Sequence, residues 1–458
     1  MKRNGFIVLV IISAIFVSAL ITFPSNREYT YNLKTFSSYE EMIDFLKSNF
    51  NKFVSHKCYI EKISVMNAGT DASDSYATRN NNIDFSRTNV QVEGVDEPDI
   101  VKTDGTYIYL IANQKIYIIK AYPSENASVL SKIDVEKDIH AENIFINGNN
   151  LIIFGNSYRA HDIQNESFWS NTPTTIVKIY DVTNKSSPQL TKEIEIDGVY
   201  FDARMLENYV YVISQEYNIY YIIDENITVN IPEIRINNET IKVPISCIYY
   251  MDMPYLPNSI VNIMAINLSN GGVVQKSFLL ENAQVMYVSQ NNIFFASYKY
   301  NIYPLDRGSY HKEKTIIYRI SIKSGDISYK AQGEVPGHIL NQFSMDEFNN
   351  FLRVATTVGS VWNGNSSNNI YILNENLSIV GKIENIAAGE KIYSARYMGE
   401  RAYLVTFKKV DPFFTIDLSN PYNPKIIGKL KIPGYSDYLH PYDENHIIGI
   451  GKETVEAI

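Results

Sequence analysis

Five carboxylate side chains lie close together where the strand-rich part of the chain begins: Glu93, Asp96, Glu97, Asp99 and Asp104. A hard cation such as Ca²⁺ takes several oxygen ligands from one loop, and Gly94 and Gly105 would permit the tight backbone paths that such a loop needs. The spacing is not that of an EF-hand loop, however. We therefore favour a tether, in which these carboxylates bond to backbone N–H groups and to Lys102. A calcium site and a catalytic carboxylate pair are the alternatives.

Two histidines form a second candidate site. His440 and His446 flank a short segment that contains Asp443 and Glu444, and imidazoles together with carboxylates can coordinate zinc. Their separation and the lack of a nearby cysteine favour an ordered loop over a zinc site.

Two arginines occupy equivalent places in two similar segments, Asp202-Ala203-Arg204 and Ser394-Ala395-Arg396. We expect both segments to be loops that precede a strand. Each arginine is then expected to bond a loop of a neighbouring repeat. A ring of such arginines around a central channel, binding an anionic ligand, is the alternative.

The composition excludes several classes of protein. The 458 residues include 41 Lys and Arg against 50 Asp and Glu, a net charge of −9, and 45% are apolar. So apolar a chain can form a core, and the charge balance does not suit a nucleic-acid binder. Two cysteines cannot staple a chain of this length. The 35 tyrosines favour strands and are expected to pack, with a carbohydrate-stacking surface as the alternative.

The N-terminus predicts export. Lys2 and Arg3 precede an uncharged run over residues 5–23, which as a helix would span about 28 Å, close to the thickness of a bilayer core. The positive flank stays inside, so everything after Pro24 should lie outside. We expect residues 1–23 to be an uncleaved signal-anchor, with a signal peptide cleaved after Ala19 as the alternative.

Export makes two further modifications relevant. Cys58 and Cys247 could form a disulfide or remain free thiols. Sequons for N-glycosylation begin at eight asparagines. They are Asn126, Asn165, Asn184, Asn226, Asn238, Asn267, Asn365 and Asn376.

Residues 24–87 are expected to form a stalk outside the membrane. Ser38 and Glu41 form a capping box, and apolar residues from Met42 to Phe53 recur at helical spacing. This pattern predicts a short amphipathic helix, packed on the main domain rather than on a partner. Residues 66–86 are small and polar and are typical of a linker.

Residues 88–458 are a succession of short strands with internal similarity. Residues 176–214 and 413–451 share an apolar strand ending in Asp, a turn, a strand ending in Gly and a final apolar strand. Six positions beside the turn can be aligned along the chain. They are Lys120, Asp181, Asn267, Ser321, Asn374 and Asp417. This pattern predicts an all-β propeller of about six four-stranded blades, with an insertion at about 215–260 and a β-sandwich array as the alternative fold.

Two long segments carry a family resemblance. Residues 88–105 (TNVQVEGVDEPDIVKTDG) and 411–453 resemble the signature stretches of a secreted or membrane-anchored β-propeller domain family that is distantly related to WD40 repeats and mainly archaeal. The resemblance implies an exported propeller of unestablished function and brings no catalytic residues. Family members continue into further blade strands, so we expect an incomplete ring with C-terminal blades missing.

The sequence therefore predicts a non-enzymatic binding or scaffolding module on the outer face of a membrane, with a protein or glycan ligand and no nucleic acid. No cofactor is expected, and calcium is the alternative. The alternative is an extracellular hydrolase or lyase that uses carboxylates in the propeller channel, although the chain contains no G-x-S-x-G, H-E-x-x-H or phosphate-binding glycine loop.

Overall fold

The computed structural model describes residues 33–54, 89–158, 173–217, 219–223, 226–237, 239–251, 257, 259–300, 313–407, 411–432 and 434–453. The expected membrane segment and linker lie outside these ranges. Within them, no helix is long and apolar enough to cross a membrane.

Strands dominate the described chain, and they form consecutive antiparallel sheets that we number I to VII. Sheet I contains β3 (Val101–Thr103), β4 (Tyr107–Ala112), β5 (Lys115–Lys120) and β6 (Ser128–Asp134). Sheet II contains β7 (Ile139–Asn147), β8 (Asn150–Ser157), β9 (Thr174–Asp181) and β10 (Gln189–Asp197). Sheet III is built on β11 (Val199–Leu206), β12 (Tyr209–Tyr217), β18 (Ser259–Asn267) and β19 (Val273–Leu280).

The second half of the chain repeats this arrangement. Sheet IV contains β20 (Val285–Val288), β21 (Asn292–Tyr300), β22 (Glu313–Lys323) and β23 (Asp326–Pro336). Sheet V contains β24 (Met345–Phe348), β25 (Phe351–Val358), β26 (Ser367–Leu373) and β27 (Ile379–Ile386). Sheet VI contains β28 (Lys391–Met398), β29 (Arg401–Phe407), β30 (Asp411–Asp417) and β31 (Lys425–Ile432). Sheet VII is the pair β32 (Tyr435–Asp443) and β33 (His446–Lys452).

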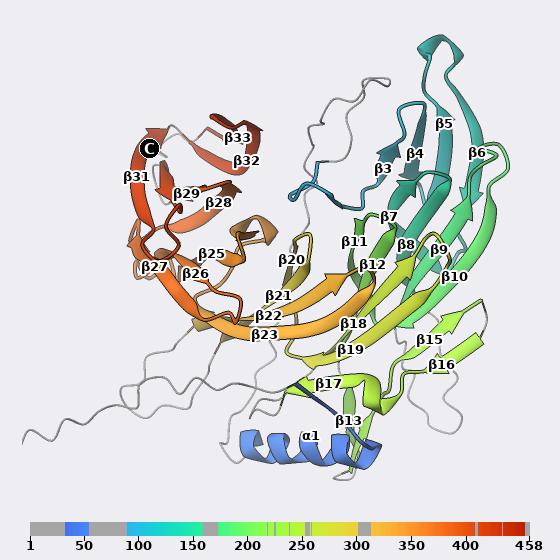
Figure 1. The fold of residues 1–458 in the computed structure, drawn as a ribbon, viewed down its shortest axis with the longest axis horizontal. Helices are drawn as coiled ribbons and strands as arrows, with labels where there is room; N and C mark the ends of the chain where they lie inside the picture. Colours follow the sequence, from blue (N-terminus) through green and yellow to red (C-terminus); the bar gives the residue numbers. More distant parts are fainter. Residues whose placement is uncertain are drawn as a thin grey trace, which may run out of the picture.

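The sheets follow one another along an arc, with sheet I at one end and sheet VII at the other (Figure 1). Alternate residues of a strand point to opposite faces, so each sheet packs on both of its neighbours. On β21, for example, Phe295 packs with residues of sheet III while Phe294 packs with residues of sheet V. Burying one such side chain contributes about 1.5–3 kcal/mol. The apolar clusters between neighbouring sheets therefore hold the arc together.

The six aligned turn positions all lie at or near the end of the third strand of a sheet: Asn374 directly follows β26, and the others lie on β5, β9, β18, β22 and β30. In several sheets this residue also shapes the turn. The side-chain oxygens of Asp181, Asn267 and Asp417 accept hydrogen bonds from backbone N–H groups two residues further on, at 2.8–2.9 Å. The repeat read from the sequence is thus a repeat of the structure.

One part of the sequence interpretation is wrong. The segments that contain Arg204 and Arg396 are not loops but the first strands β11 and β28 of sheets III and VI. The repeat unit therefore spans the last two strands of one sheet and the first two of the next. A bulge before Asp202 and another before Ser394 interrupt the apolar alternation that marks the other strands.

The insertion between β12 and β18 holds the N-terminal helix. It contains the hairpin β13 (Tyr220–Ile223) and β14 (Asn226–Val229), the 3₁₀ turn η2 (Ile245–Cys247) and β17 (Ile248–Met251), which pairs in parallel with β19. Two further strands, β15 (Glu233–Ile236) and β16 (Glu239–Lys242), extend sheet II beyond β10. The 3₁₀ turn η1 (Ser124–Asn126) lies between β5 and β6.

The amphipathic helix is confirmed as α1 (Tyr39–Val54), which follows the short strand β1 (Leu33–Thr35) (Figure 1). Ser38 Oγ accepts a hydrogen bond from the N–H of Glu41 at 3.2 Å, as a capping box requires. Met42 and Leu46 are fully buried in the cluster between sheets II and III. β1 also pairs with β17, so this region packs on the main domain as expected.

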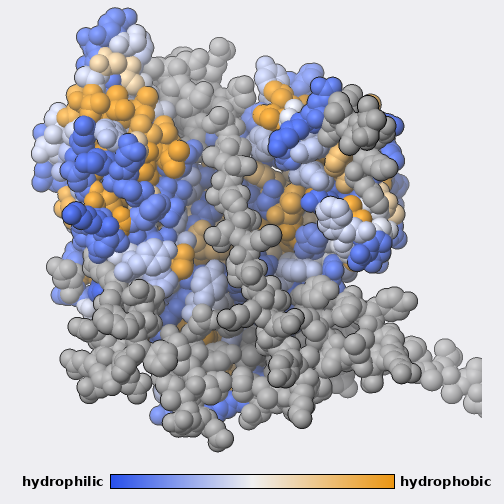
Figure 2. All heavy atoms as spheres, turned by 180° about the vertical axis from the view of Figure 1, so that it is seen from behind, coloured by the Kyte–Doolittle hydropathy of each residue, from blue (hydrophilic) through white to orange (hydrophobic). Residues whose placement is uncertain are grey.

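The outer edges of the described sheets carry apolar side chains. Ile427 and Leu430 on β31 and Ile450 on β33 are each more than half exposed. Figure 2 shows that the back of the molecule mixes apolar patches with hydrophilic surface. Exposed edge strands of this kind can pair with further strands.

Candidate functional site

Residues 89–104, which we call the strap, run along the inner side of the arc and contact one sheet after another. Asn89 Nδ2 donates to the hydroxyl of Tyr438 in sheet VII at 2.9 Å. Gln91 Nε2 donates to the carbonyl oxygen of Met345 in sheet V at 2.9 Å. The amide of Gln290, beside sheet IV, donates to the carbonyl of Glu93 at 3.0 Å.

The second half of the strap continues this path. Residues Val95–Asp96 form β2, which pairs with β11 of sheet III. Asp99 forms a β-bridge with Ile144 on β7 of sheet II, and the chain then enters β3 of sheet I. The strap therefore links sheets that are far apart in sequence, and its Asn89 contacts Tyr438, 349 residues further along the chain.

Four of the five carboxylates of the strap form local bonds, as the tether interpretation predicts, and Glu93 is exposed. Asp96 forms an ion pair with Lys102 at 2.8 Å. Lys102 is only 5% exposed, and burial lowers its pKa although Asp96 opposes the shift. Glu97 accepts a hydrogen bond from the N–H of Gln91 at 3.1 Å. Asp99 accepts one from the N–H of Ile100 at 2.7 Å.

Asp104 closes the turn between β3 and β4. One of its oxygens accepts from the N–H groups of Thr106 and Tyr107, and the other accepts from the hydroxyl of Tyr109 at 3.0 Å. Within the part of the chain that the structure describes, no three His, Cys, Asp or Glu side chains are grouped as metal ligands. A calcium site at Glu93, Asp96, Glu97, Asp99 and Asp104 remains a prediction without structural support.

Arg204 and Arg396 both reach the 3₁₀ turn η3 (Gln342–Ser344), which precedes sheet V. Arg204 Nη2 donates to Gln342 Oε1 at 2.9 Å, and its Nη1 lies 2.7 Å from Asp202. The guanidinium of Arg396 lies over the ring of Phe343, 5.0 Å from the ring centre. Arg204, on sheet III, thus bonds the connection between sheets IV and V, whereas the sequence predicts a loop of the neighbouring repeat. Burial lowers the pKa of Arg396. Burial also acts to lower the pKa of Arg204, but the charges of Asp202 and Glu97 outweigh it, and the pKa is raised.

The two histidines have separate environments. His440 is buried beside Asn89 and Tyr438, and burial together with Arg396 lowers its pKa. His446 is exposed and pairs with Asp443 at 2.8 Å. Their contacts give no shared zinc site.

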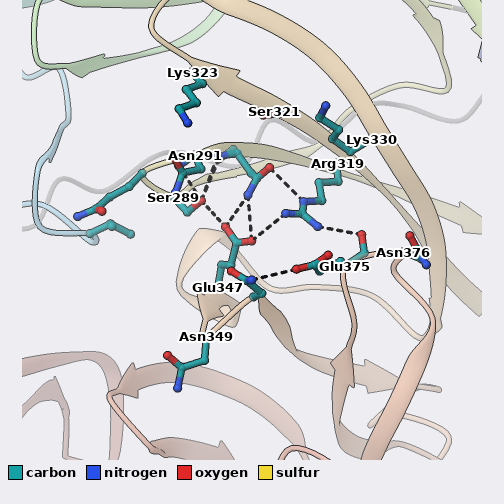
Figure 3. Close-up of a pocket in the computed structure, with 14 residues that line it drawn as sticks. Ser289, Asn291, Arg319, Ser321, Lys323, Lys330, Glu347, Asn349, Glu375 and Asn376 are labelled. Carbon is teal, nitrogen blue, oxygen red and sulfur yellow. Dashed lines mark hydrogen bonds and ion pairs between the residues drawn. The ribbon is translucent and has the colours of Figure 1, made fainter.

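A cavity of about 710 Å³ lies where the turns of sheets IV and V meet. Its walls carry amides, hydroxyls and charged groups (Figure 3). The lining residues are Val92, Ser289, Gln290, Asn291, Asn292, Arg319, Ser321, Lys323, Lys330, Glu347, Asn349, Asn350, Glu375 and Asn376. No motif in the sequence marked this group, although the clusters of asparagine at its turns were a visible signal.

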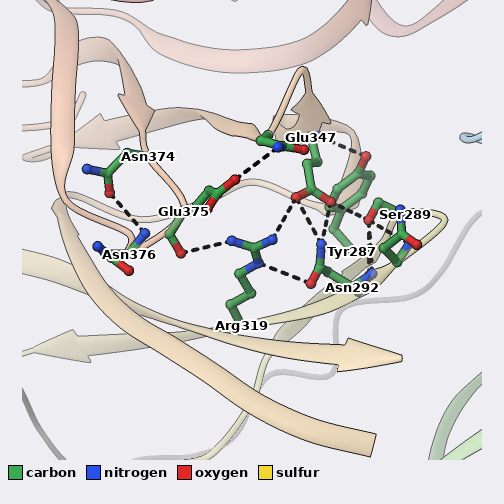
Figure 4. Close-up of polar contacts among 10 residues, drawn as sticks. Tyr287, Ser289, Asn292, Arg319, Glu347, Asn374, Glu375 and Asn376 are labelled. Carbon is green, nitrogen blue, oxygen red and sulfur yellow. Dashed lines mark hydrogen bonds and ion pairs between the residues drawn. The ribbon is translucent and has the colours of Figure 1, made fainter. Parts of the chain in front are cut away.

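A network of polar side chains forms one wall of the cavity (Figure 4). Asn292 Nδ2 donates to both oxygens of Glu347 at 2.9 Å, and Ser289 Oγ also donates to this carboxylate. Arg319 lies 3.5 Å from Glu347, bonds Asn292 Oδ1 at 3.0 Å and donates to the carbonyl of Glu375 at 2.8 Å. The network therefore joins sheet IV to β24 and to the turn between β26 and β27 of sheet V.

The described sequons differ in exposure. Asn126, Asn184, Asn365 and Asn376 are exposed on turns, and Asn376 lines the cavity. Asn267 is half-buried, and its amide nitrogen, the atom that a glycan would need, donates to the hydroxyl of Tyr209 at 3.2 Å. Nothing is described of Asn165, Asn238 or the side chain of Asn226.

The remaining sequence predictions concern one thiol and the tyrosines. Cys247 is half-buried in η2. Cys58, with which it could form a disulfide, lies outside the described residues, so both alternatives stay open. Tyr109 and Tyr211 are buried between sheets, as expected for packing residues.

Consecutive four-stranded meanders packed face to face around a common centre define the class of β-propellers. The family model of the Beta propeller domain matches residues 85–458, and the chain belongs to this family. The β-sandwich alternative is thereby excluded.

Two relatives are similar to most of the chain. The uncharacterized protein MJ1554 of Methanocaldococcus jannaschii is 30% identical, over 91% of this chain and 73% of its own length. An uncharacterized protein of Archaeoglobus fulgidus is 28% identical, over 94% of this chain and 78% of its own length.

Solved structures are more distant. Hsv2 of Kluyvelomyces marxianus matches with 10% identity and a TM-score of 0.33, covering 72% of this chain and 79% of that one. A hypothetical selenium-binding protein from Sulfolobus tokodaii matches with the same identity and TM-score, covering 76% of each chain.

Proposed function

We propose that the protein is a non-enzymatic binding or scaffolding module on the outer face of a membrane, held there by residues 1–23 or released by cleavage after Ala19. Membership of the propeller family supports the binding role, because rigid sheets present loops to partners. The charged flank and the uncharged run at the N-terminus support the location. The partner is a protein or a glycan at the cell surface.

The observation that carries the binding role is how the carboxylates of the strap are used. A hydrolase or lyase of the alternative kind needs carboxylates that are free to transfer protons or attack a substrate. Asp96 is instead paired with buried Lys102, and Asp104 accepts three hydrogen bonds. These contacts favour a structural role for the strap over catalysis.

Surface labelling of intact cells tests the proposed location. Cells that produce the full chain are treated with a membrane-impermeant amine reagent, with a cytoplasmic protein of the same cells as the control. The full chain should be labelled before lysis while the control is not. Labelling of the chain only after the membrane is permeabilised would contradict the outward orientation.

A further inference from the structure

We propose that the cavity between sheets IV and V binds short anionic oligosaccharides. The proposal rests on the binding role above and names its ligand class. The volume of about 710 Å³ lies within the range of small-ligand sites. Turns from two neighbouring sheets border the cavity, so a ligand there would contact both (Figure 3).

One wall of the cavity is fixed before any ligand arrives. Asn292 is 3% exposed and Ser289 is 6% exposed, and both hold the carboxylate of Glu347. Arg319 offsets the charge of this carboxylate. A satisfied polar network is rigid and needs little reordering on binding. Glu347 therefore shapes the site without repelling an anion.

Two lysines supply the charge that would attract the ligand. Lys323, at the end of β22, and Lys330, on β23, are both exposed at the cavity. Within the described residues neither of them forms an ion pair. Figure 3 shows them along one wall, with Asn349 along the opposite one. The lining carries three cationic side chains, Arg319, Lys323 and Lys330, against the two carboxylates Glu347 and Glu375. In a chain with a net charge of −9, this local excess of positive charge favours an anion.

The other lining groups indicate what the anion is attached to. Amides such as Gln290, Asn291 and Asn349 and the hydroxyl of Ser321 can donate and accept hydrogen bonds along a chain of hydroxyl groups. Among the lining residues there is no aromatic ring on which a nucleobase could stack, and Val92 is the single apolar side chain. A polyhydroxylated ligand that carries carboxylates or sulfates fits these walls best.

Calorimetric titration of the full chain tests the proposal. The probes are trigalacturonate, a sulfated trisaccharide, uncharged maltotriose and inorganic phosphate. We expect saturable binding of at least one acidic trisaccharide and clearly weaker binding of maltotriose and phosphate. The double variant Lys323→Gln/Lys330→Gln should bind the acidic sugar about tenfold more weakly, because two charged contacts are lost.

A matched control separates the site from the overall charge. Lys137→Gln/Lys425→Gln removes the same charge from exposed positions outside the cavity and should leave affinity unchanged. The proposal fails if neither acidic sugar binds, if maltotriose or phosphate binds equally well, or if both double variants lose affinity alike. Such a failure would leave surface labelling unaffected, whereas labelling confined to permeabilised cells would contradict the proposed function itself.

Discussion

Glu216 is a carboxylic acid enclosed on β12, where it is 4% exposed. Burial, helped by the nearby charge of Asp197, raises the pKa of Glu216 to about 8. The folded state therefore holds a proton that the unfolded chain releases at about pH 4.3. The contribution of Glu216 to the free energy of unfolding is constant below that pH. It falls by about 1.4 kcal/mol per pH unit up to about pH 8 and is constant again above it.

The variant Glu216→Gln should lack this dependence, since its amide does not ionise. Between pH 5 and pH 8, chemical denaturation should show that the unfolding free energy of the variant falls with pH less steeply than that of the unmodified chain. The difference between the two slopes should be about 1.4 kcal/mol per pH unit. Glu239→Gln, at an exposed position on β16, is the matched control and should keep the slope. Equal slopes for the two variants would contradict the assignment of Glu216.

The contact between Asp96 and Lys102 is a second feature at this scale. Asp96→Asn leaves a buried ammonium without its counter-charge, which we expect to cost about 3 kcal/mol of unfolding free energy. Glu93→Gln, at an exposed position in the same strap, should change stability by less than about 0.5 kcal/mol. Denaturant unfolding of the two variants compares them directly. A loss at Asp96 no greater than at Glu93 would show that the ion pair does not secure the strap.

At the scale of elements, helix α1 is held by its apolar face. Met42→Ala should cost about 2–5 kcal/mol, because Met42 is fully buried between the helix and sheets II and III. Ser48→Ala, on the exposed face of the same helix, should change stability by less than about 0.5 kcal/mol. Thermal or denaturant unfolding of the full chain measures both. Similar small effects would mean that the helix is not part of the cooperative unit.

The strap is the element for which a metal was the alternative. Four of its five carboxylates, those of Asp96, Glu97, Asp99 and Asp104, are engaged in hydrogen bonds or an ion pair. Calcium should therefore leave the thermal midpoint of the full chain unchanged. The measurement compares melting in calcium with melting in a chelator, and in magnesium as the control for ionic strength. A rise in midpoint that is specific to calcium would restore the calcium site.

Local patterns predicted local elements well. The capping box at Ser38 and the turn positions such as Asp181 and Asp417 describe contacts within a few residues, which a sequence displays directly. The sequence did not predict the strand β11, because its charged residues interrupt the apolar alternation that marks a strand. Arg204 is buried, pairs with the partly exposed Asp202 and donates to Gln342 of η3, and a sequence does not display these contacts.

At the scale of the whole molecule, the repeat predicted the propeller but not the cavity. Glu347 and Asn292 are 55 residues apart, and they meet only because successive sheets place β24 beside the start of β21. The path of the strap is likewise determined by where the successive sheets lie. Its acidic residues were visible in the sequence, whereas the sheets that they join were not.

We propose that the molecule binds a ligand without transforming it, because the carboxylates of the strap hold the fold together. The most direct test incubates the full chain with anionic and neutral polysaccharides and measures bound polymer and released products in the same samples. Retention of an anionic polymer with no product is the predicted result. Product release that is abolished by Glu97→Gln in a folded variant would contradict the claim.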